Sequence, residues 1–281
     1  MKSNKHSNIL REVSNILVEL GIQVTVRQLY YQLVSKQVIE NTINSYKNFD
    51  RILTKARKEQ LIDDSNIVDT SKPILIPSTW ININEFLQDV SNAYRKSVWN
   101  TQDNHIEIWL EKDALRSVFQ PITDKYDVAL VIGKGYQSYT NLKETSHRIQ
   151  ENKELNICYF GDFDPTGLDI ERNISSTLIE LNTKHNIRRI ALTKEQIEKY
   201  DIPPLPTKVS DTRTAKHKEL HGDIAVELDA LDPRILTKLI EDTIISFLDI
   251  NKYNTTKQQE KKEQETIKKL IGDTNGFTDK Q

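Results

Sequence analysis

Cysteine is almost absent from this sequence, since Cys158 is the single one among 281 residues. One cysteine excludes an intramolecular disulfide framework and any zinc site built from several cysteines. Because Cys158 lies within an apolar stretch, we expect it to be a small buried side chain. Long apolar runs are also missing, so no segment approaches the length of a membrane-spanning helix. The polar start MKSNKHSN lacks the apolar core of a signal peptide, and we expect a cytoplasmic protein, or a nuclear one if the host has a nucleus, with no membrane partner.

Neither sign of charge dominates the chain, since the formal net charge is −2. Residues 1–60 nevertheless hold ten Lys and Arg against five Asp and Glu, a balance of +5, which leaves −7 for the remainder. A basic segment joined to an acidic one is typical of a DNA-docking module attached to a metal-binding module, although chance also produces it. The length is sufficient for two domains with sizeable cores.

Three short helices are predicted in the first sixty residues. In the first, apolar side chains recur at helical spacing after a candidate N-cap at Ser7, and Gly21 ends the pattern. Thr25 is placed to cap a second helix, VRQLYYQLVS. A third helix, about residues 44–60, has an apolar side made by Phe49, Ile52, Leu53 and Ala56.

The third helix carries basic residues away from its apolar side, namely Lys47, Arg51, Lys55 and Lys58. The next segment, LIDDSNIVDTSKPILI, is short, β-prone and rich in turn residues, as a wing would be. We therefore predict an N-terminal winged-helix DNA-binding domain, residues 1–78, which places its third helix in a DNA groove. The alternative is an ordinary small bundle with a solvated basic face.

The second helix contains two adjacent tyrosines, Tyr30 and Tyr31. At about 100° per residue, Tyr30 lies in the apolar stripe, so we expect its ring to be packed. Tyr31 lies roughly 130° away, beside Arg27 one turn earlier, and we expect it to point outward. A neighbouring guanidinium would favour the phenolate and could hold a phosphate, which suits a nucleophilic tyrosine. An inert surface tyrosine beside an arginine is the alternative.

Strands and helices alternate after a predicted helical linker at residues 79–104. The apolar runs HIEIWL, VALVIG, NICYF and RRIALT predict four strands, with helices at about 140–151 and 168–181 between them. This order is typical of an α/β domain with a parallel, Rossmann-like sheet covered on both faces. We assign residues 105–254 to that domain. Residues 255–281 form a charged tail, for which we expect a solvated helix or a mobile arm.

Three carboxylates follow the predicted strands directly. Glu111 ends the first strand, and Asp162 and Asp164 follow the third in the stretch CYFGDFDPTGLDI. Ligands of such sheets bind beyond the carboxyl ends of the strands, where these side chains would meet and repel one another without a cation. All-oxygen ligands select Mg²⁺ or Mn²⁺ over zinc, and such an ion serves phosphoryl chemistry. The sequence therefore predicts a metal site formed by Glu111, Asp162 and Asp164.

Several of these motifs together resemble one known family. EKDAL, VIGKGYQS and YFGDFDPTGLDI are similar to the Toprim domain found in the A-type chain of topoisomerase VI and in the related meiotic double-strand-break transesterase. TVRQLYYQL resembles the winged-helix tyrosine motif of the same family, and VELDALDP resembles a late segment. The resemblance covers most of residues 7–245. The chain contains no ATPase domain, and it is shorter than the usual A-type chain.

The resemblance implies a Mg²⁺-dependent DNA transesterase similar to the A-type chain of a type IIB topoisomerase. Tyr31 would form the 5′-phosphotyrosyl link, Arg27 would be the arginine of the tyrosine motif, and Glu111 the Toprim glutamate. In this family two copies cooperate, so that the tyrosine of one faces the metal of the other. A homodimer on double-stranded DNA is therefore expected, in a nucleoid-associated location, and strand passage would require a separate ATPase (B-type) subunit.

Smaller features and alternatives stay open at this stage. Lys134, in the turn Gly133-Lys134-Gly135, is a candidate DNA contact, although such a turn is often merely tight. Glu227 and Asp229 in VELDALDP are candidate outer neighbours of the metal, and spacing does not decide between them. A hydrolytic Toprim nuclease would use the metal site without Tyr31. A non-catalytic DNA-binding protein would use neither.

Overall fold

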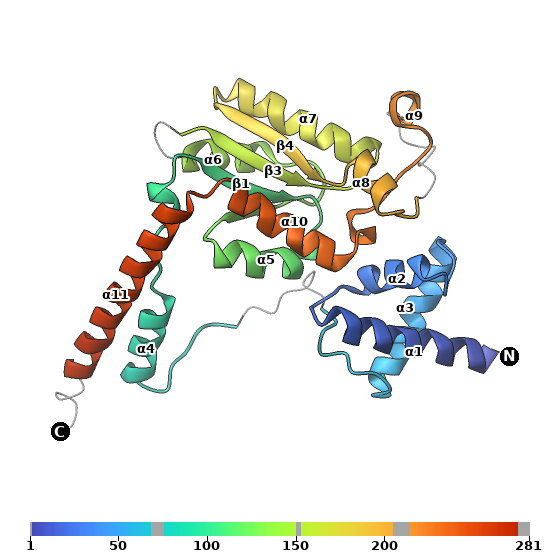
Figure 1. Cartoon of the computed structure of the whole chain (residues 1–281), viewed down its shortest axis with the longest axis horizontal. Coiled ribbons are helices and arrows are strands. Elements are labelled where there is room, and N and C mark those ends of the chain that lie inside the picture. Colours follow the sequence, from blue (N-terminus) through green and yellow to red (C-terminus); the bar gives the residue numbers. More distant parts are fainter. Residues whose placement is uncertain (1, 69–75, 150–152, 205–213, 275–281) are drawn as a thin grey trace.

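The computed structural model describes residues 2–68, 76–149, 153–204 and 214–274, with the backbone alone for residues 2–5, 214, 216 and 272–274. Figure 1 shows a helical unit at the N-terminus, a sheet with helices on both faces, and a two-helix arm that leads to the C-terminus. The described part of the chain has no helix both long and apolar enough to cross a membrane.

The N-terminal unit consists of α1 (Lys2–Leu20), α2 (Val26–Ser35) and α3 (Ile43–Lys58). Thr25 caps α2 in a capping box with Gln28, as expected from the sequence, and Thr42 caps α3. Gly21 ends α1 with φ of +62°. The predicted cap at Ser7 is wrong, because α1 already begins at Lys2. Apolar side chains of all three helices pack into one core, which includes Ile9, Val13, Ile16, Leu29, Leu33, Phe49 and Leu53.

The wing of the predicted winged helix is not seen in the described residues. After α3, the described backbone forms one isolated parallel bridge between Val24 and Ile67. Residues 69–75 of the predicted wing lie outside the described part of the chain. The N-terminal unit is thus a three-helix unit, and its winged-helix character stays a prediction.

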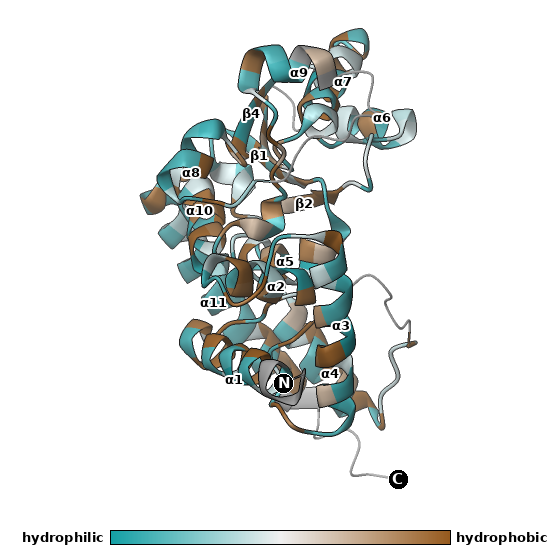
Figure 2. Cartoon of the chain, turned by 90° about the vertical axis from the view of Figure 1, so that its right-hand side faces the viewer, coloured by the Kyte–Doolittle hydropathy of each residue, from teal (hydrophilic) through white to brown (hydrophobic). Residues whose placement is uncertain are grey.

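The central sheet has four parallel strands, as the alternating pattern predicted, and their order is β2-β1-β3-β4. Its strands are β1 (His105–Leu110), β2 (Ala129–Ile132), β3 (Leu155–Phe160) and β4 (His185–Ala191). One face packs on α5 (Arg116–Lys125) and α10 (Pro233–Ser246), and the other on α6 (Tyr139–Arg148) and α7 (Pro165–Glu180). Alternation along β3 explains this: Cys158 and Phe160 face α5 and α10, whereas Ile157 and Tyr159 face α7. Strand β2 (ALVI) is apolar, whereas β4 (HNIRRIA) mixes polar and apolar residues (Figure 2).

Shorter elements connect these parts. They are η1 (Trp99–Thr101), η2 (Asp113–Leu115), α8 (Lys194–Lys199), α9 (Thr214–His221) and η3 (Leu228–Ala230). The turn η3 matters most for the site, because it contacts α2 and so joins the helical unit to the sheet. Ala230 of η3 packs against the core of the helical unit.

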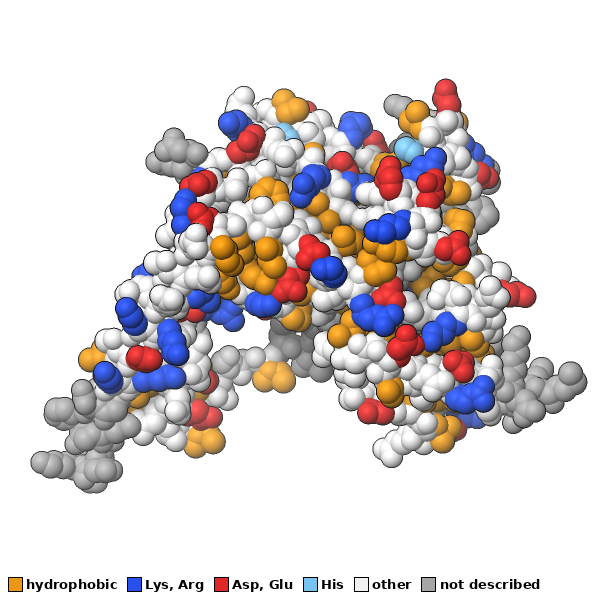
Figure 3. All heavy atoms as spheres, in the orientation of Figure 1, with side chains coloured by type: hydrophobic (Ala, Val, Ile, Leu, Met, Phe, Trp, Pro, Cys, Tyr) orange, Lys and Arg blue, Asp and Glu red, His pale blue; other side chains and the backbone are white. Residues whose placement is uncertain are grey.

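The arm is formed by α4 (Ile83–Ala93) and α11 (Ile250–Thr274), which lie side by side (Figure 1). Glu263 of α11 connects this helix to the residues that follow α4: its carboxylate accepts hydrogen bonds from Tyr94 and from Lys96, the latter at 2.8 Å. Residues 255–269 lie within α11. A solvated helix was one of the two structures expected for this charged segment, the other being a mobile arm. Figure 3 shows Lys and Arg side chains along this arm, where exposed lysines include Lys261, Lys262, Lys268 and Lys269.

Candidate active site

Glu111 and Asp162 meet beyond the carboxyl ends of β1 and β3. The two strands are neighbours, with Leu110 opposite Phe160, so the residues that follow them emerge side by side. Glu111 Oε2 accepts a hydrogen bond from the backbone N–H of Asp162 at 3.0 Å and another from the Tyr159 hydroxyl at 3.1 Å. Burial raises the pKa of the Glu111 carboxyl, and the nearby charge of Asp164 raises it further.

Asp162 is held on its other side by the late segment of the domain. Its Oδ1 accepts a hydrogen bond from the backbone N–H of Leu228 at 2.8 Å. Burial raises the Asp162 pKa to about 7, the ammonium of Lys112 opposes this rise, and the charge of Glu111 adds to it. A bound cation would lower the raised pKa of this carboxyl, because a nearby positive charge favours the ionised carboxylate.

Asp164 caps helix α7. Its Oδ1 accepts the N–H of Gly167 at 2.7 Å, and Pro165 follows at the first helical position. The glycines of this turn are needed for space. A Cβ at Gly161 would collide with Glu111 Oε2 and the Tyr159 ring, and one at Gly167 would collide with the Asp162 carbonyl. The sequence GDFDPTG is thus a turn shaped around the Glu111 carboxylate.

Glu111, Asp162 and Asp164 together form an acidic corner of the sheet, and their carboxylate oxygens are suitable ligands for a hard divalent cation. Its three carboxylates lie within electrostatic reach, since the charge of Asp164 raises the pKa of Glu111 and the charge of Glu111 raises that of Asp162. One oxygen of each carboxylate is engaged by a backbone N–H. Among the described residues, no group of three or more His, Cys, Asp and Glu is already gathered tightly enough to hold an ion.

Tyr30 and Tyr31 both lie in the core of the helical unit, with exposed fractions of 3% and 4%. The expectation for Tyr30 is confirmed: its hydroxyl donates to the Thr42 carbonyl at 3.0 Å and accepts the Thr42 N–H at 2.9 Å. The expectation that Tyr31 points outward is wrong. The helical wheel assumes that a helix is buried on its apolar side alone. Helix α2 also packs against η3, and this second contact buries the side of α2 that carries Tyr31.

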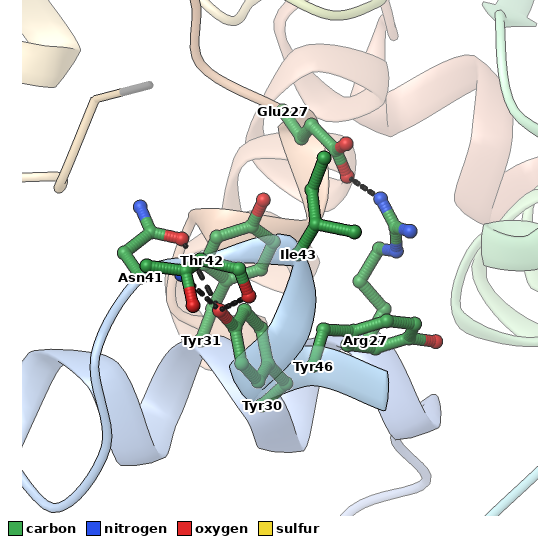
Figure 4. A pocket seen from close by; sticks show the side chains of 8 residues that line it. All are labelled: Arg27, Tyr30, Tyr31, Asn41, Thr42, Ile43, Tyr46 and Glu227. Atoms are coloured by element: carbon green, nitrogen blue, oxygen red, sulfur yellow. Dashed lines mark hydrogen bonds and ion pairs between the residues drawn. The ribbon is translucent and has the colours of Figure 1, made fainter. Parts of the chain in front are cut away.

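Tyr31 contributes to a small cavity of about 100 Å³. It is lined by Arg27, Tyr30, Tyr31, Asn41, Thr42, Ile43, Tyr46 and Glu227. Figure 4 shows the Tyr30 hydroxyl directed at Asn41 and Thr42, and the Tyr31 hydroxyl directed away from them. Burial raises the pKa of Tyr31 far above its usual value, and the charge of Glu227 adds to this, while Arg27 lowers it. Arg27 therefore acts in the expected direction, but burial outweighs it.

An ionic network connects the tyrosine helix with the acidic corner. Arg27 forms an ion pair with Glu227, which lies 200 residues later in the chain (Figure 4). Lys112, the residue after Glu111, lies 3.0 Å from Glu227 Oε2 and 2.5 Å from Asp229 Oδ2. The hydroxyl of Thr25 donates to Asp229 at 3.4 Å. The sequence suggested Glu227 and Asp229 as outer neighbours of the metal without deciding between them. Lys112 was not predicted, and its only signal was its place beside Glu111.

The candidate DNA contacts are on the surface. Lys47, Arg51, Lys55 and Lys58 are exposed on α3, opposite the buried Phe49, Ile52, Leu53 and Ala56, as the periodicity predicted. Lys134 follows β2 with a side chain 76% exposed, and its ammonium lies 3.4 Å from Asp113. The structure gathers Arg27 with Tyr31, and Glu111 with Asp162. It does not bring Tyr31 into contact with the three carboxylates.

Comparison with known proteins supports the Toprim assignment. Residues 108–241 match the family model for the Toprim domain shared by the A-type chain of topoisomerase 6 and Spo11. Neither a curated protein nor a solved structure matches the chain. The matched region begins within β1, at Ile108, and contains the other three strands, the Asp162–Asp164 turn and η3. Residues 108–241 are accordingly a Toprim domain of the kind shared by the topoisomerase 6 A-type chain and Spo11.

Proposed function

We propose that the protein cleaves double-stranded DNA by transesterification, with Tyr31 as the nucleophile. One observation carries the proposal. A tyrosine helix with Arg27 beside Tyr31 is joined by Glu227 and Lys112 to the acidic corner of a Toprim domain from a DNA-cleaving family. The Toprim match alone supports DNA cleavage, and the network supports the use of both parts of the chain.

The reaction would exchange one phosphoester for another. The Tyr31 oxygen attacks a backbone phosphorus, the bond to the 3′ oxygen breaks, and that oxygen leaves as a 3′-hydroxyl after it takes a proton. The Tyr31 proton is lost to solvent or a neighbouring base, and the protein stays linked to the 5′ phosphate. Because the Tyr31 phenol is buried and its pKa is raised, the pocket must open toward DNA before attack.

Arg27 would bind the attacked phosphate, since a guanidinium presents paired donors to phosphate oxygens. Glu111, Asp162 and Asp164 would hold Mg²⁺ or Mn²⁺, and such an ion neutralises charge on the reacting phosphate and its leaving oxygen. Lys47, Arg51, Lys55 and Lys58 on α3, together with Lys134, would contact the DNA backbone, in the manner of a winged helix.

The assembly would be a homodimer in which Tyr31 of one protomer serves the metal of the other. A cut through both strands needs two tyrosines, and one chain contains a single candidate. A separate ATPase (B-type) subunit would be required for strand passage. The domain limits at residues 78, 104 and 254 are retained as predictions.

A covalent complex tests the proposal. The protein is incubated with labelled duplex DNA and Mg²⁺ and then denatured, and DNA attached to the protein is measured. Tyr31→Phe should abolish the complex, while Tyr30→Phe, which removes a hydroxyl bonded inside the core, should reduce stability but leave a covalent product. Undiminished complex formation by Tyr31→Phe would overturn the proposal.

Hydrolytic cleavage is the second candidate, and the burial of Tyr31 favours it. A water molecule at the acidic corner would then attack the phosphate, and the products would carry free ends. This function requires that Asp162→Ala loses cleavage and Tyr31→Phe keeps it. Tight DNA binding without metal-dependent breakage would instead indicate a non-catalytic DNA-binding protein.

A further inference from the structure

We propose that Glu227 occupies the phosphate site of Arg27 in the DNA-free protein, and that a DNA phosphate displaces it. Glu227 is then a positioning residue, which acts on the Tyr31 pocket through Arg27. The inference rests on the proposed function in taking DNA as the ligand, and it does not require that the DNA be cut.

The surroundings of Arg27 suit exchange of one anion for another. Its Nη1 binds the Glu227 carboxylate, and its guanidinium carbon lies 4.8 Å from the centroid of the Tyr46 ring. The ring fixes one side of the guanidinium by a cation–π contact and leaves the donor edge for an anion. Carboxylate and phosphate oxygens accept from the same donor fork. The Arg27 side chain is 33% exposed, so solvent reaches the ion pair.

Lys112 provides the place to which Glu227 can retreat. Its ammonium lies 3.0 Å from the same Glu227 oxygen that Arg27 binds. Loss of a partner from a buried ion pair is costly when a charge is left alone. Here Glu227 keeps Lys112 after Arg27 turns to a phosphate, so neither carboxylate nor guanidinium is left without an opposite charge.

The pocket opens toward the surface that is expected to carry DNA. Asn41, Thr42 and Ile43 line it and are at least partly exposed, and α3 with its exposed basic residues begins at Ile43. Ile43 is itself 73% exposed. A volume of about 100 Å³ equals that of roughly three water molecules, so the cavity fits a phosphate group and not a whole nucleotide. A backbone that follows α3 would bring phosphates to this pocket.

Displacement would also change the electrostatic surroundings of Tyr31. In the DNA-free protein Glu227 and Arg27 act on the phenol in opposite directions, and the ion pair largely cancels the effect of the guanidinium. The incoming phosphate brings a negative charge of its own to Arg27, so displacement exchanges one anion for another near the phenol. DNA binding would thus bring the target phosphate to the nucleophile.

Glu227→Gln tests the inference through DNA affinity in Mg²⁺-free buffer. The amide keeps the size of the side chain and removes the charge that competes with phosphate. Affinity for a duplex, measured by fluorescence anisotropy, should rise about tenfold, because the phosphate no longer has to displace a carboxylate from a charge-assisted contact with Arg27. The slope of log K against log salt should stay the same, since Arg27 neutralises one phosphate in both proteins.

A matched charge control is available on α8. Glu198 is exposed, its side chain forms no ion pair within the described residues, and Glu198→Gln changes the net charge equally. This variant should leave affinity almost unchanged. The double variant Arg27→Gln/Glu227→Gln should lose the whole gain, because the gain acts through Arg27. If Glu227→Gln unfolds the protein, Glu227→Asp is used, which retracts the carboxylate from Arg27 and keeps a charge for Lys112.

The outcomes separate the inference from the proposed function. Affinity that is unchanged or weaker in Glu227→Gln, or a gain that survives removal of Arg27, overturns the inference even if the wild type forms covalent complexes. An Arg27-dependent gain in a protein that forms no covalent complex supports the inference and counts against transesterification.

Discussion

Glu111 and Asp162 are 51 residues apart in sequence, yet the backbone N–H of Asp162 donates to Glu111 Oε2 at 3.0 Å. The hydrogen bond exists because β1 and β3 are adjacent parallel strands that end at the same level. It shows that the turn after β3 has a second role besides holding aspartates. The turn also orients the glutamate that ends the neighbouring strand.

Gly161→Ala should damage this arrangement. The added methyl group would collide with Glu111 Oε2 and with the Tyr159 ring, so one of them must move. We expect a loss of about 1 to 3 kcal/mol in the free energy of unfolding, measured with urea, and a large loss of Mg²⁺-dependent DNA cleavage. Gly222→Ala is the control, since nothing lies within 4 Å of its Cβ and only its φ of +87° is unfavourable. It should destabilise by about 1 kcal/mol and retain cleavage. Equal activities of the two variants would contradict this account of the turn.

Mg²⁺ should raise the thermal unfolding temperature of the wild type. The carboxylates of Glu111, Asp162 and Asp164 are crowded, and a cation bound to the folded state relieves their repulsion. A concentration of 100 times Kd would add about 2.7 kcal/mol. Differential scanning calorimetry with Mg²⁺ and with chelator measures the difference. Asp162→Asn should lose most of the shift, and Glu198→Gln should keep it. A shift that is identical in Asp162→Asn would place the ion elsewhere.

The sequence was sufficient for the order of elements but not for the contacts between units. Alternating apolar residues and strand ends placed Glu111 beside Asp162, because parallel strands have a simple geometry. The burial of Tyr31 was not predictable in the same way, since it depends on η3, which lies about two hundred residues later and packs on α2. A helical wheel contains no such long-range information. For the same reason Lys112 was overlooked: its partners Glu227 and Asp229 come from a distant segment.

The basic side of α3 should contribute to DNA affinity through separate phosphate contacts. Arg51→Gln and Lys58→Gln remove exposed charges from α3 while its buried side stays intact. Each should weaken binding regardless of DNA sequence, and each should reduce the salt slope by about 0.9. Lys268→Gln removes an equally exposed charge from α11 and should have little effect. If all three variants lost the same amount of DNA affinity, the result would indicate a general electrostatic attraction between protein and DNA and would contradict docking by α3.

Glu107 gives a prediction about stability that is independent of catalysis. Its side chain is fully buried in β1, where it accepts from Trp109 Nε1 at 2.9 Å and lies 3.1 Å from Arg148. Burial alone would raise the Glu107 pKa, but the nearby His105 and the hydrogen bonds from Arg148 and Trp109 outweigh it, and the pKa is lowered. Glu107→Gln should therefore cost about 2 to 3 kcal/mol of unfolding free energy at pH 7, less than a fully buried pair because Arg148 is partly exposed.

The pH dependence of that cost has a definite sign. A carboxyl with a lowered pKa in the folded state contributes stability above its unfolded pKa, and this stability is lost as the pH falls through the folded value. The difference between wild type and Glu107→Gln, measured by urea unfolding, should be full at pH 7 and shrink as the pH is taken below about 4.5, the usual glutamate value. Arg148→Gln should reproduce part of the cost at pH 7, since it leaves Glu107 with Trp109 and His105. A cost that grows toward acid pH would mean that Glu107 is protonated in the folded protein at neutral pH.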